Sequence, residues 1–167
     1  AAGASADPAA PAAESERDAP PVFSAEALTV RYPGAARAAL DGVSLAVEGG
    51  TLYAVLGPNG SGKSTLMRAL MGVIPPTAGR AAVEGRAAGR WPPRELARRV
   101  GAVSQSESVA FPLTVRELVG MGRYPHLGAL GGEGAGDRRA VEAALERCDV
   151  SHLRGRDVGT LSGGELQ

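Results

Sequence analysis

The feature that most constrains this chain is a glycine-rich segment between an apolar run and a stretch with helical character. The apolar run is Thr51–Leu56, the segment Gly57–Thr65 reads GPNGSGKST, and the helical pattern covers Lys63–Met71. Such an apolar run predicts a strand that is buried on both faces. Glycines let backbone N–H groups approach phosphate oxygens, and the positive end of the following helix faces the same anion. The sequence therefore predicts a phosphate-binding loop between a buried strand and a helix.

The residue types of this loop have separable tasks. The Lys63 ammonium would reach the β- and γ-phosphates of a nucleotide, and the Ser64 hydroxyl would bind Mg²⁺. Lys63 is the only lysine among 18 basic residues, as expected where a compact ammonium is needed rather than a guanidinium. The alternative is a glycine-rich turn that ends in Lys-Ser by chance, and the flanking strand and helix disfavour it. The predicted nucleotide contacts are Gly57, Pro58, Asn59, Gly60, Ser61, Gly62, Lys63, Ser64 and Thr65.

Charge and composition limit the other classes of function. The 18 basic and 18 acidic side chains cancel, which disfavours a nucleic-acid-binding domain that works through bulk positive charge. The single cysteine, Cys148, excludes an internal disulfide framework and a cysteine-based zinc site. No run approaches the length of apolar sequence that a membrane-spanning helix needs. A soluble, intracellular α/β domain is therefore the expectation.

Residues 1–21 differ in composition from the rest of the chain. They are Ala, Pro, Ser and acidic residues with almost no large apolar side chain, so they cannot bury enough surface to offset the entropy of ordering. We expect a disordered tail. A signal peptide is disfavoured because the segment has neither a basic start nor a stretch rich in Leu or Phe.

Short patterns predict the remaining elements. The expected strands are Val22–Arg31, Leu40–Val47, Ala81–Glu84 and a buried Val100–Ser104, and the expected helices are Pro93–Arg99, Thr114–Met121 and Asp137–Cys148. Thr114 followed by Glu117 has the spacing of a capping box. The apolar face of the last helix is predicted from the helical spacing of Val141, Ala144, Leu145 and Cys148.

A second motif, Leu161-Ser162-Gly163-Gly164-Glu165, lies near the end of the sequence. Its serine and glycines would present a hydroxyl and bare N–H groups at a helix N-terminus. By itself this is an ordinary helix entry, but together with the phosphate loop it resembles the signature motif of the ABC-transporter ATPases. The resemblance covers residues 22–167. It implies ATP and Mg²⁺ as ligands, and a head-to-tail homodimer in which each signature motif closes on the γ-phosphate held by the other copy.

Two further positions match the family. Tyr32 corresponds to the aromatic residue that stacks on adenine, and Gln105 to the Q-loop glutamine that helps hold Mg²⁺ or the attacking water. Outside this context they would be interpreted as an exposed tyrosine near a turn and a solvated loop glutamine. The resemblance implies Lys63 and Gln105 as catalytic residues, with Ser64 and Gln105 as metal contacts.

The segments Phe111–Glu117 and Gly122–His126 resemble the helical domain of importers for iron–siderophores, haem and cobalamin. This implies an ATP-hydrolysing subunit at the cytoplasmic face of the cell membrane. Its partners would be membrane permease subunits and a substrate-binding protein, with no nucleic acid. His126 is not predicted to ligate haem, because a lone histidine beside proline in a loop is usually solvated and the substrate crosses through the membrane subunits.

The implied fold class is α/β: a P-loop NTPase core with an N-terminal antiparallel β subdomain and an α-helical subdomain, the C-terminal part missing. The expected parts are a tail (1–21), the β subdomain and P-loop core (22–105), the helical subdomain (106–160) and the signature motif (161–167). A complete family member continues to an apolar strand ending in Asp and to a catalytic Glu. We therefore expect exposed apolar surface beside the phosphate-loop strand, and weak or no ATP hydrolysis by the chain alone.

Two alternatives remain at this point. The chain could be a non-catalytic nucleotide-binding module, because everything that it contains serves binding. A non-transport ABC ATPase that acts on DNA or ribosomes is disfavoured by the compact motif spacing and the zero net charge.

Overall fold

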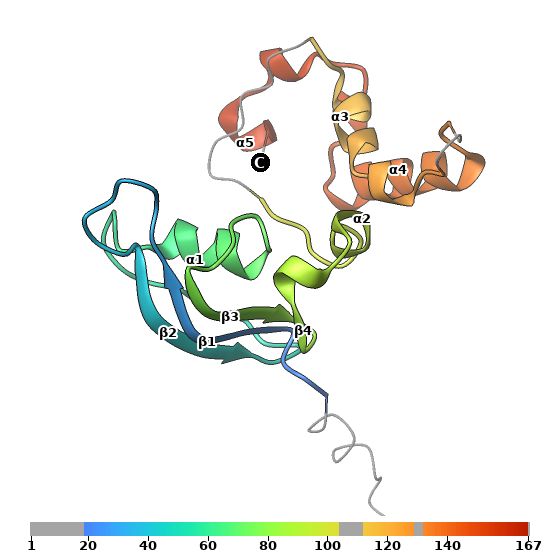
Figure 1. The fold of residues 1–167 in the computed structure, drawn as a ribbon. Coiled ribbons are helices and arrows are strands. Elements are labelled where there is room, and N and C mark those ends of the chain that lie inside the picture. Colours follow the sequence, from blue (N-terminus) through green and yellow to red (C-terminus); the bar gives the residue numbers. More distant parts are fainter. Residues whose placement is uncertain (1–18, 104–111, 129–131, 167) are drawn as a thin grey trace, which may run out of the picture. The chain divides into compact units, whose positions relative to one another are not determined.

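The computed structural model describes residues 19–103, 112–128 and 132–166, which divide into two compact units (Figure 1). The β unit ends at Trp91 and the helical unit begins at Pro92. Within the described ranges, no helix is long and apolar enough to cross a membrane.

The β unit is built on a four-stranded antiparallel sheet with the strand order β2-β1-β3-β4. Its strands are β1 (Phe23–Val30), β2 (Leu40–Val47), β3 (Ala78–Val83) and β4 (Arg86–Ala87). The first two confirm the predicted strands closely. β3 begins earlier than predicted because its first residues still pair with β1, through Glu26↔Arg80 and Thr29↔Ala78. The antiparallel β subdomain expected from the sequence is therefore present.

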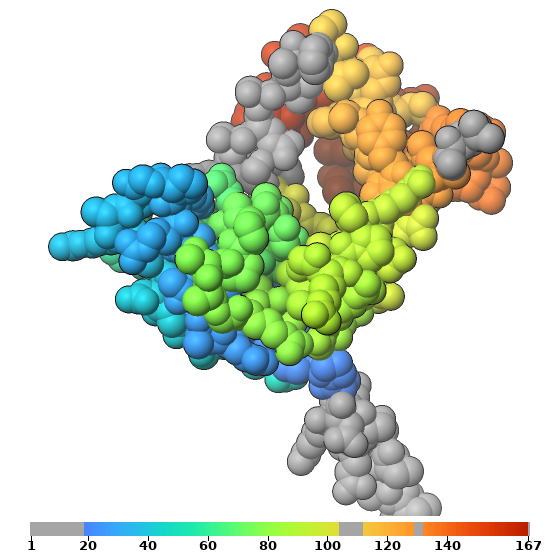
Figure 2. Space-filling model, in the orientation of Figure 1, coloured from blue at the N-terminus to red at the C-terminus, as the bar shows by residue number. Residues whose placement is uncertain are grey.

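The helix α1 (Lys63–Leu70) packs on this sheet and contacts β1 and β3. Its buried side chains Leu66, Ala69 and Leu70 meet a sheet core in which Leu28 is fully buried. In the space-filling view, the green segment of α1 and β3 forms one body with the blue and cyan strands (Figure 2). The predicted helix is confirmed, and it ends just before Gly72, whose left-handed φ of 70° cannot continue an α-helix.

Two predicted buried strands are wrong. Neither Thr51–Leu56 nor Val100–Val103 forms a strand, and the side chains of Leu52, Leu56 and Val103 are 99%, 90% and 87% exposed. Ser104, the last residue of the second run, lies outside the described residues. A strand buried on both faces needs ladder partners along its edges and packed layers above and below. The described parts of the chain supply no such partners, so the apolar surface expected beside the phosphate loop is exposed.

The helical unit contains α2 (Pro93–Leu96), α3 (Val115–Met121), α4 (Ala135–Arg147) and α5 (Gly163–Leu166). Its core consists of five buried side chains: Val115, Val141, Leu145, Leu153 and Val158. The predicted helices in this region are therefore confirmed, with shorter bounds for α2. On the predicted apolar face of α4, Val141 and Leu145 are buried as expected. Cys148 is exposed because it follows the last helical residue as its C-cap.

The first turn of α3 is held from two sides. The predicted capping box is confirmed, since the Glu117 N–H donates to Thr114 Oγ1 at 3.3 Å and the Thr114 N–H donates to Glu117 Oε2 at 2.8 Å. The next two amides, which have no partner inside a helix, donate to a distant segment. Val115 N–H binds the Arg156 carbonyl and Arg116 N–H binds the Arg154 carbonyl, each at 3.0 Å. We call residues 154–158 the pre-signature segment.

The buried core of the helical unit gives a stability prediction. Leu145 is fully buried, so Leu145→Ala removes apolar contacts and leaves a cavity. We expect it to lower the free energy of unfolding of this unit by about 2–5 kcal/mol, measured by urea denaturation followed by circular dichroism. The matched control, Leu52→Ala at a fully exposed position, should change stability by less than about 0.5 kcal/mol. Equal effects of the two substitutions would contradict this description of the core.

The capping box predicts a pH dependence. The Thr114 N–H and hydroxyl, and to a lesser extent the Arg116 charge, hold the pKa of Glu117 below its ordinary value. A lowered folded-state pKa means that the stabilisation is complete above the unfolded-state pKa and is lost as the pH falls through the folded-state pKa. We therefore expect acid titration to weaken α3 in wild type, and Glu117→Gln to remove this part of the pH dependence.

Helix content followed by circular dichroism against pH measures this effect. Glu146→Gln serves as the control, because the Glu146 side chain makes no hydrogen bond within the described residues. If Glu146→Gln flattens the pH profile as much as Glu117→Gln does, the capping carboxylate is not its source.

Candidate functional site

The glycine-rich loop passes directly into α1 through a left-handed residue. Gly62 has φ 91°, and a Cβ at this position would collide with the Ala39 carbonyl oxygen and lie 2.9 Å from Leu40 Cδ2. No other residue type fits this close approach without a shift of the backbone. Gly62 is also the N-cap of α1, and no side chain caps the helix there. The first-turn amides of an eight-residue helix are thus not occupied by a capping side chain, as an anion-binding helix start requires.

Lys63 lies across this loop. Its Nζ donates to the carbonyl oxygens of Gly57 and Pro58, both at 2.8 Å. These bonds hold the only lysine of the chain at the loop that was predicted to bind phosphate. An ammonium has three N–H donors, so two bonds to carbonyls leave one donor for an anion.

Tyr32 lies beside the same helix start, although it is distant in the sequence. The hydroxyl oxygens of Tyr32 and Thr65 are 3.3 Å apart, within hydrogen-bonding distance. Thr65 is buried in the first turn of α1, whereas Ser64 is exposed. The β unit therefore brings together the predicted phosphate loop, the predicted metal contact Ser64 and the predicted adenine-stacking residue Tyr32.

The residues at the loop fit an anion better than a metal ion alone. The cradle supplies N–H groups and an ammonium, which are donors and positive charges. Within the described ranges, no group of three or more His, Cys, Asp or Glu side chains could hold a metal ion. Ser64 would be a single oxygen ligand, and Mg²⁺ at such sites is typically bound by few protein ligands together with substrate phosphates and water. Gln105, the other predicted metal contact and a predicted catalytic residue, lies outside the described residues.

The second predicted motif begins α5 in the helical unit. The Ser162 N–H and hydroxyl both donate to Glu165 Oε2, at 2.8 Å and 2.7 Å. Ser162, Gly163 and Gly164 are exposed, while Leu161 is half-buried. The bonds from the Ser162 N–H and hydroxyl hold the pKa of Glu165 below its ordinary value, and the nearby charges of Arg156 and His152 act in the same direction.

Arg156 completes this arrangement and was not identified from the sequence. Its Nη1 donates to Glu165 Oε1 at 3.2 Å, and its Nη2 donates to the Thr160 carbonyl at 2.9 Å. An arginine in the stretch before a capping carboxylate is too common a pattern to identify such a pair. A second missed pair is Arg94 and Arg98, one helical turn apart, whose Nε atoms both donate to the Pro125 carbonyl, at 3.1 Å and 2.7 Å.

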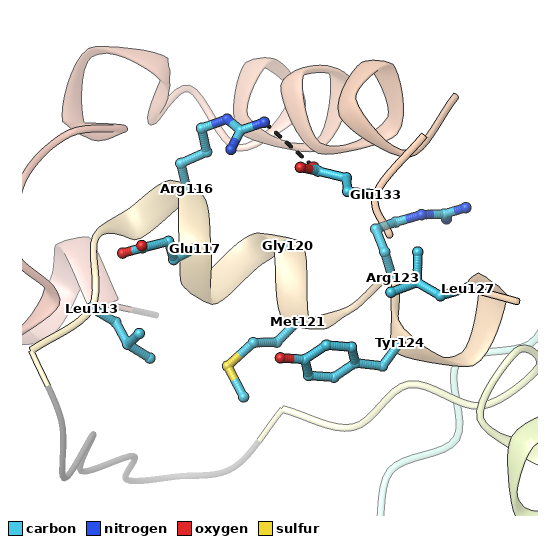
Figure 3. A pocket seen from close by; sticks show the side chains of 9 residues that line it. All are labelled: Leu113, Arg116, Glu117, Gly120, Met121, Arg123, Tyr124, Leu127 and Glu133. Atoms are coloured by element: carbon cyan, nitrogen blue, oxygen red, sulfur yellow. Dashed lines mark hydrogen bonds and ion pairs between the residues drawn. The ribbon is translucent and has the colours of Figure 1, made fainter. Parts of the chain in front are cut away.

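A cavity of about 580 Å³ lies along α3 and the turn that follows it (Figure 3). The lining residues come from α3 and the residue two positions before it, from the turn at Tyr124–His126 with its two flanking residues, and from the loop before α4: Leu113, Arg116, Glu117, Gly120, Met121, Arg123, Tyr124, Leu127 and Glu133. An ion pair between Arg116 and Glu133, 3.4 Å apart, crosses one side of it, and the half-exposed Met121 and Tyr124 lie side by side at another. The cavity thus combines apolar side chains with a charged rim, and it involves the two segments that resemble importer sequences.

Comparison with known proteins supports the family resemblance that was found in the sequence. The sequence model of one protein family, described as ABC transporter, matches residues 40–167. The hemin import ATP-binding protein of Nocardia farcinica is 44% identical over 132 residues, which are 79% of this chain and 45% of that protein. The cobalamin import ATP-binding protein of Halobacterium salinarum is 44% identical over 128 residues, or 77% of this chain and 32% of that protein. The chain spans about half the length of the hemin-import relatives that it matches.

A solved structure shares the fold. It is a dimeric ATP-binding cassette in a post-hydrolysis state, bound to ADP and phosphate. The two chains are 25% identical with a TM-score of 0.71, and the match covers 86% of this chain and 65% of the other. The P-loop NTPase fold with its two subdomains, as predicted from the sequence, is therefore confirmed.

The loop geometry predicts that substitution by alanine destabilises the β unit more at one glycine than at another. Gly60 and Gly62 both have left-handed φ values, 80° and 91°, but only at Gly62 would a Cβ meet other atoms. We expect Gly62→Ala to lower the free energy of unfolding of the β unit by about 2–4 kcal/mol. Gly60→Ala, which adds backbone strain alone, should lower it by about 1–2 kcal/mol. Urea denaturation of both variants measures these free energies of unfolding. Equal decreases in the two variants would show that the collision with the Ala39 carbonyl does not determine the requirement for glycine at position 62.

Proposed function

Because the chain belongs to the ABC transporter family, which the match over residues 40–167 shows, we propose that it binds ATP with Mg²⁺ and belongs to an ATP-hydrolysing importer subunit. The observation that carries this proposal is the phosphate cradle, in which Lys63 spans a loop that ends at an uncapped helix start. The substrate class that we propose is haem, cobalamin or an iron–siderophore, because relatives at 44% identity are hemin and cobalamin import proteins.

Each residue of the cradle would bind a different part of the nucleotide or its metal ion. The N–H groups before and within the first turn of α1 would bind phosphate oxygens, and Lys63 would exchange its bonds to Gly57 and Pro58 for the β- and γ-phosphates. Ser64 is exposed at the helix start and would contact Mg²⁺, whose charge would offset that of the phosphates. The Tyr32 ring, held beside Thr65, would stack on adenine.

The signature motif supports a homodimer. Ser162, Gly163 and Gly164 are exposed in the helical unit, where they would meet a phosphate held by a second copy of the chain. We propose a head-to-tail arrangement with two nucleotides between the copies. A solved ATP-binding cassette with the same fold is dimeric and holds ADP and phosphate.

The cavity along α3 is the proposed contact with membrane permease subunits. Its half-exposed Met121 and Tyr124 offer apolar area, and its rim carries charges of both signs from Arg116, Arg123 and Glu133. This combination suits an amphipathic segment of a partner. The subunit would then lie at the cytoplasmic face of the membrane and act with a substrate-binding protein. Gln105 would transmit nucleotide state to this region.

Nucleotide binding is the direct test. We expect the 167-residue chain to bind ATP in the presence of Mg²⁺, and Lys63→Ala to weaken binding by at least about tenfold, because it removes a charge-assisted contact. Isothermal titration calorimetry measures both. Arg68→Ala is the control, since it removes a positive charge from the exposed side of the last turn of the same helix. It should leave the affinity within about twofold of wild type.

A second pair of titrations separates base from phosphate recognition. Tyr32→Ala should weaken ATP binding but leave the affinity for tripolyphosphate unchanged, because the ring is proposed to contact adenine alone. Wild-type chain that binds neither ligand would contradict the proposed function, and equal losses for both ligands would contradict the role of Tyr32.

A further inference from the structure

Arg156 connects two parts of the helical unit through different groups. Its backbone carbonyl accepts the Val115 N–H at the start of α3, at 3.0 Å. Its guanidinium binds forward in the sequence, to the Glu165 carboxylate and to the Thr160 carbonyl. The main chain of Arg156 is therefore bonded to the start of α3, while its side chain is bonded to the start of α5 and to the residue before the signature motif.

The two oxygens of the Glu165 carboxylate are used separately. Oε2 accepts the N–H and the hydroxyl of Ser162, and Oε1 accepts Arg156 Nη1. Within the described residues, Arg156 makes no hydrogen bond to Ser162 itself, so it can act on the serine only through Glu165. Arg156 thus adds a third hydrogen bond to a carboxylate that Ser162 already holds by its other oxygen.

The charge of Glu165 is a difficulty for the proposed function. A carboxylate bonded to Ser162 places a negative charge at the surface that would receive the γ-phosphate of ATP. The carboxylate and the phosphate would repel each other, and burial of the dimer interface would strengthen the repulsion. The hydrogen bonds from Ser162 lower the pKa of Glu165, so the carboxylate does not lose its charge by taking up a proton at neutral pH. The guanidinium of Arg156, whose Nη1 lies 3.2 Å from Glu165 Oε1, places a compensating positive charge beside the carboxylate.

We propose that Arg156 is a positioning residue of the signature motif, which orients Glu165 and neutralises it so that Ser162 can meet an anionic phosphate. This inference rests on the proposed ATP-binding dimer. It assigns the pre-signature segment a role in assembly of the nucleotide site, in addition to its packing on α3.

The chain offers a matched control. Arg154 lies two residues earlier in the same segment, and its carbonyl likewise accepts an α3 amide, that of Arg116. Its side chain makes no hydrogen bond or ion pair within the described residues. Arg154→Gln thus removes the same charge from the same segment and leaves the Glu165 contact intact.

The first readout is ATP-driven dimerisation of the full 167-residue chain, measured by analytical ultracentrifugation with ATP and Mg²⁺. We expect Arg156→Gln to weaken the dimer by about five- to thirtyfold, and Arg154→Gln to change it by less than about twofold. ATP affinity of the monomer should not change, because the phosphate loop belongs to the β unit. Arg156→Lys, which keeps the charge but not the fork, should recover part of the loss.

The decisive variant is the double substitution Arg156→Gln with Glu165→Gln. If Arg156 acts by neutralising Glu165, removal of both charges restores dimerisation to within about twofold of Glu165→Gln alone. If Arg156 only stabilises the fold, the double variant is at least as weak as Arg156→Gln, and the proposal is overturned.

A second readout does not depend on dimerisation. Hydrogen exchange of the Ser162 amide, followed by NMR, should accelerate about three- to tenfold in Arg156→Gln, whereas the Val115 amide, held by the backbone carbonyl, should stay unchanged. Wild-type chain that binds no ATP or does not dimerise would contradict the proposed function. Unchanged exchange at Ser162 would contradict the role of Arg156 in either case.

Discussion

The close approach of Gly62 to the Ala39 carbonyl is the contact on which the candidate site of the β unit depends. It allows α1 to start directly against the beginning of β2, and the helix then packs on β1 and β3. Lys63 follows as the first helical residue and folds back over the loop, while Thr65 meets Tyr32. A larger side chain at position 62 would displace the helix start, and with it the lysine and the N–H groups that form the cradle.

In the helical unit, the pre-signature segment has the corresponding role. It supplies backbone acceptors to the first turn of α3, and its Val158 N–H donates to the Leu113 carbonyl at 2.8 Å. The same segment carries Arg156 toward the signature motif. The side chains that line the α3 cavity and the residues proposed to meet a second nucleotide are thus joined by a short run of hydrogen bonds.

Local patterns predicted what local contacts decide. The capping box at Thr114 and Glu117 and the buried face of α4 at Val141 and Leu145 follow from spacings of three and four residues, and both are present. The run Thr51–Leu56 shows the limit of this reasoning, because an apolar pattern indicates what a segment could bury and not whether partner strands cover it. Its side chains are exposed, since strand pairing is a non-local property.

The sequence alone determined the motifs, the capping box of α3 and the segments that form β1 and β2, because the glycine spacing, the capping residues and the hydrophobic periods act within a few residues of the chain. Only the tertiary structure decided which distant groups share a site. The Tyr32 hydroxyl meets Thr65 across 33 residues, and the Arg156 carbonyl meets Val115 while its guanidinium holds Glu165. Such pairs depend on how whole segments pack. The spacing of residues in the sequence does not predict the direction in which the carbonyls and side chains of a folded segment point.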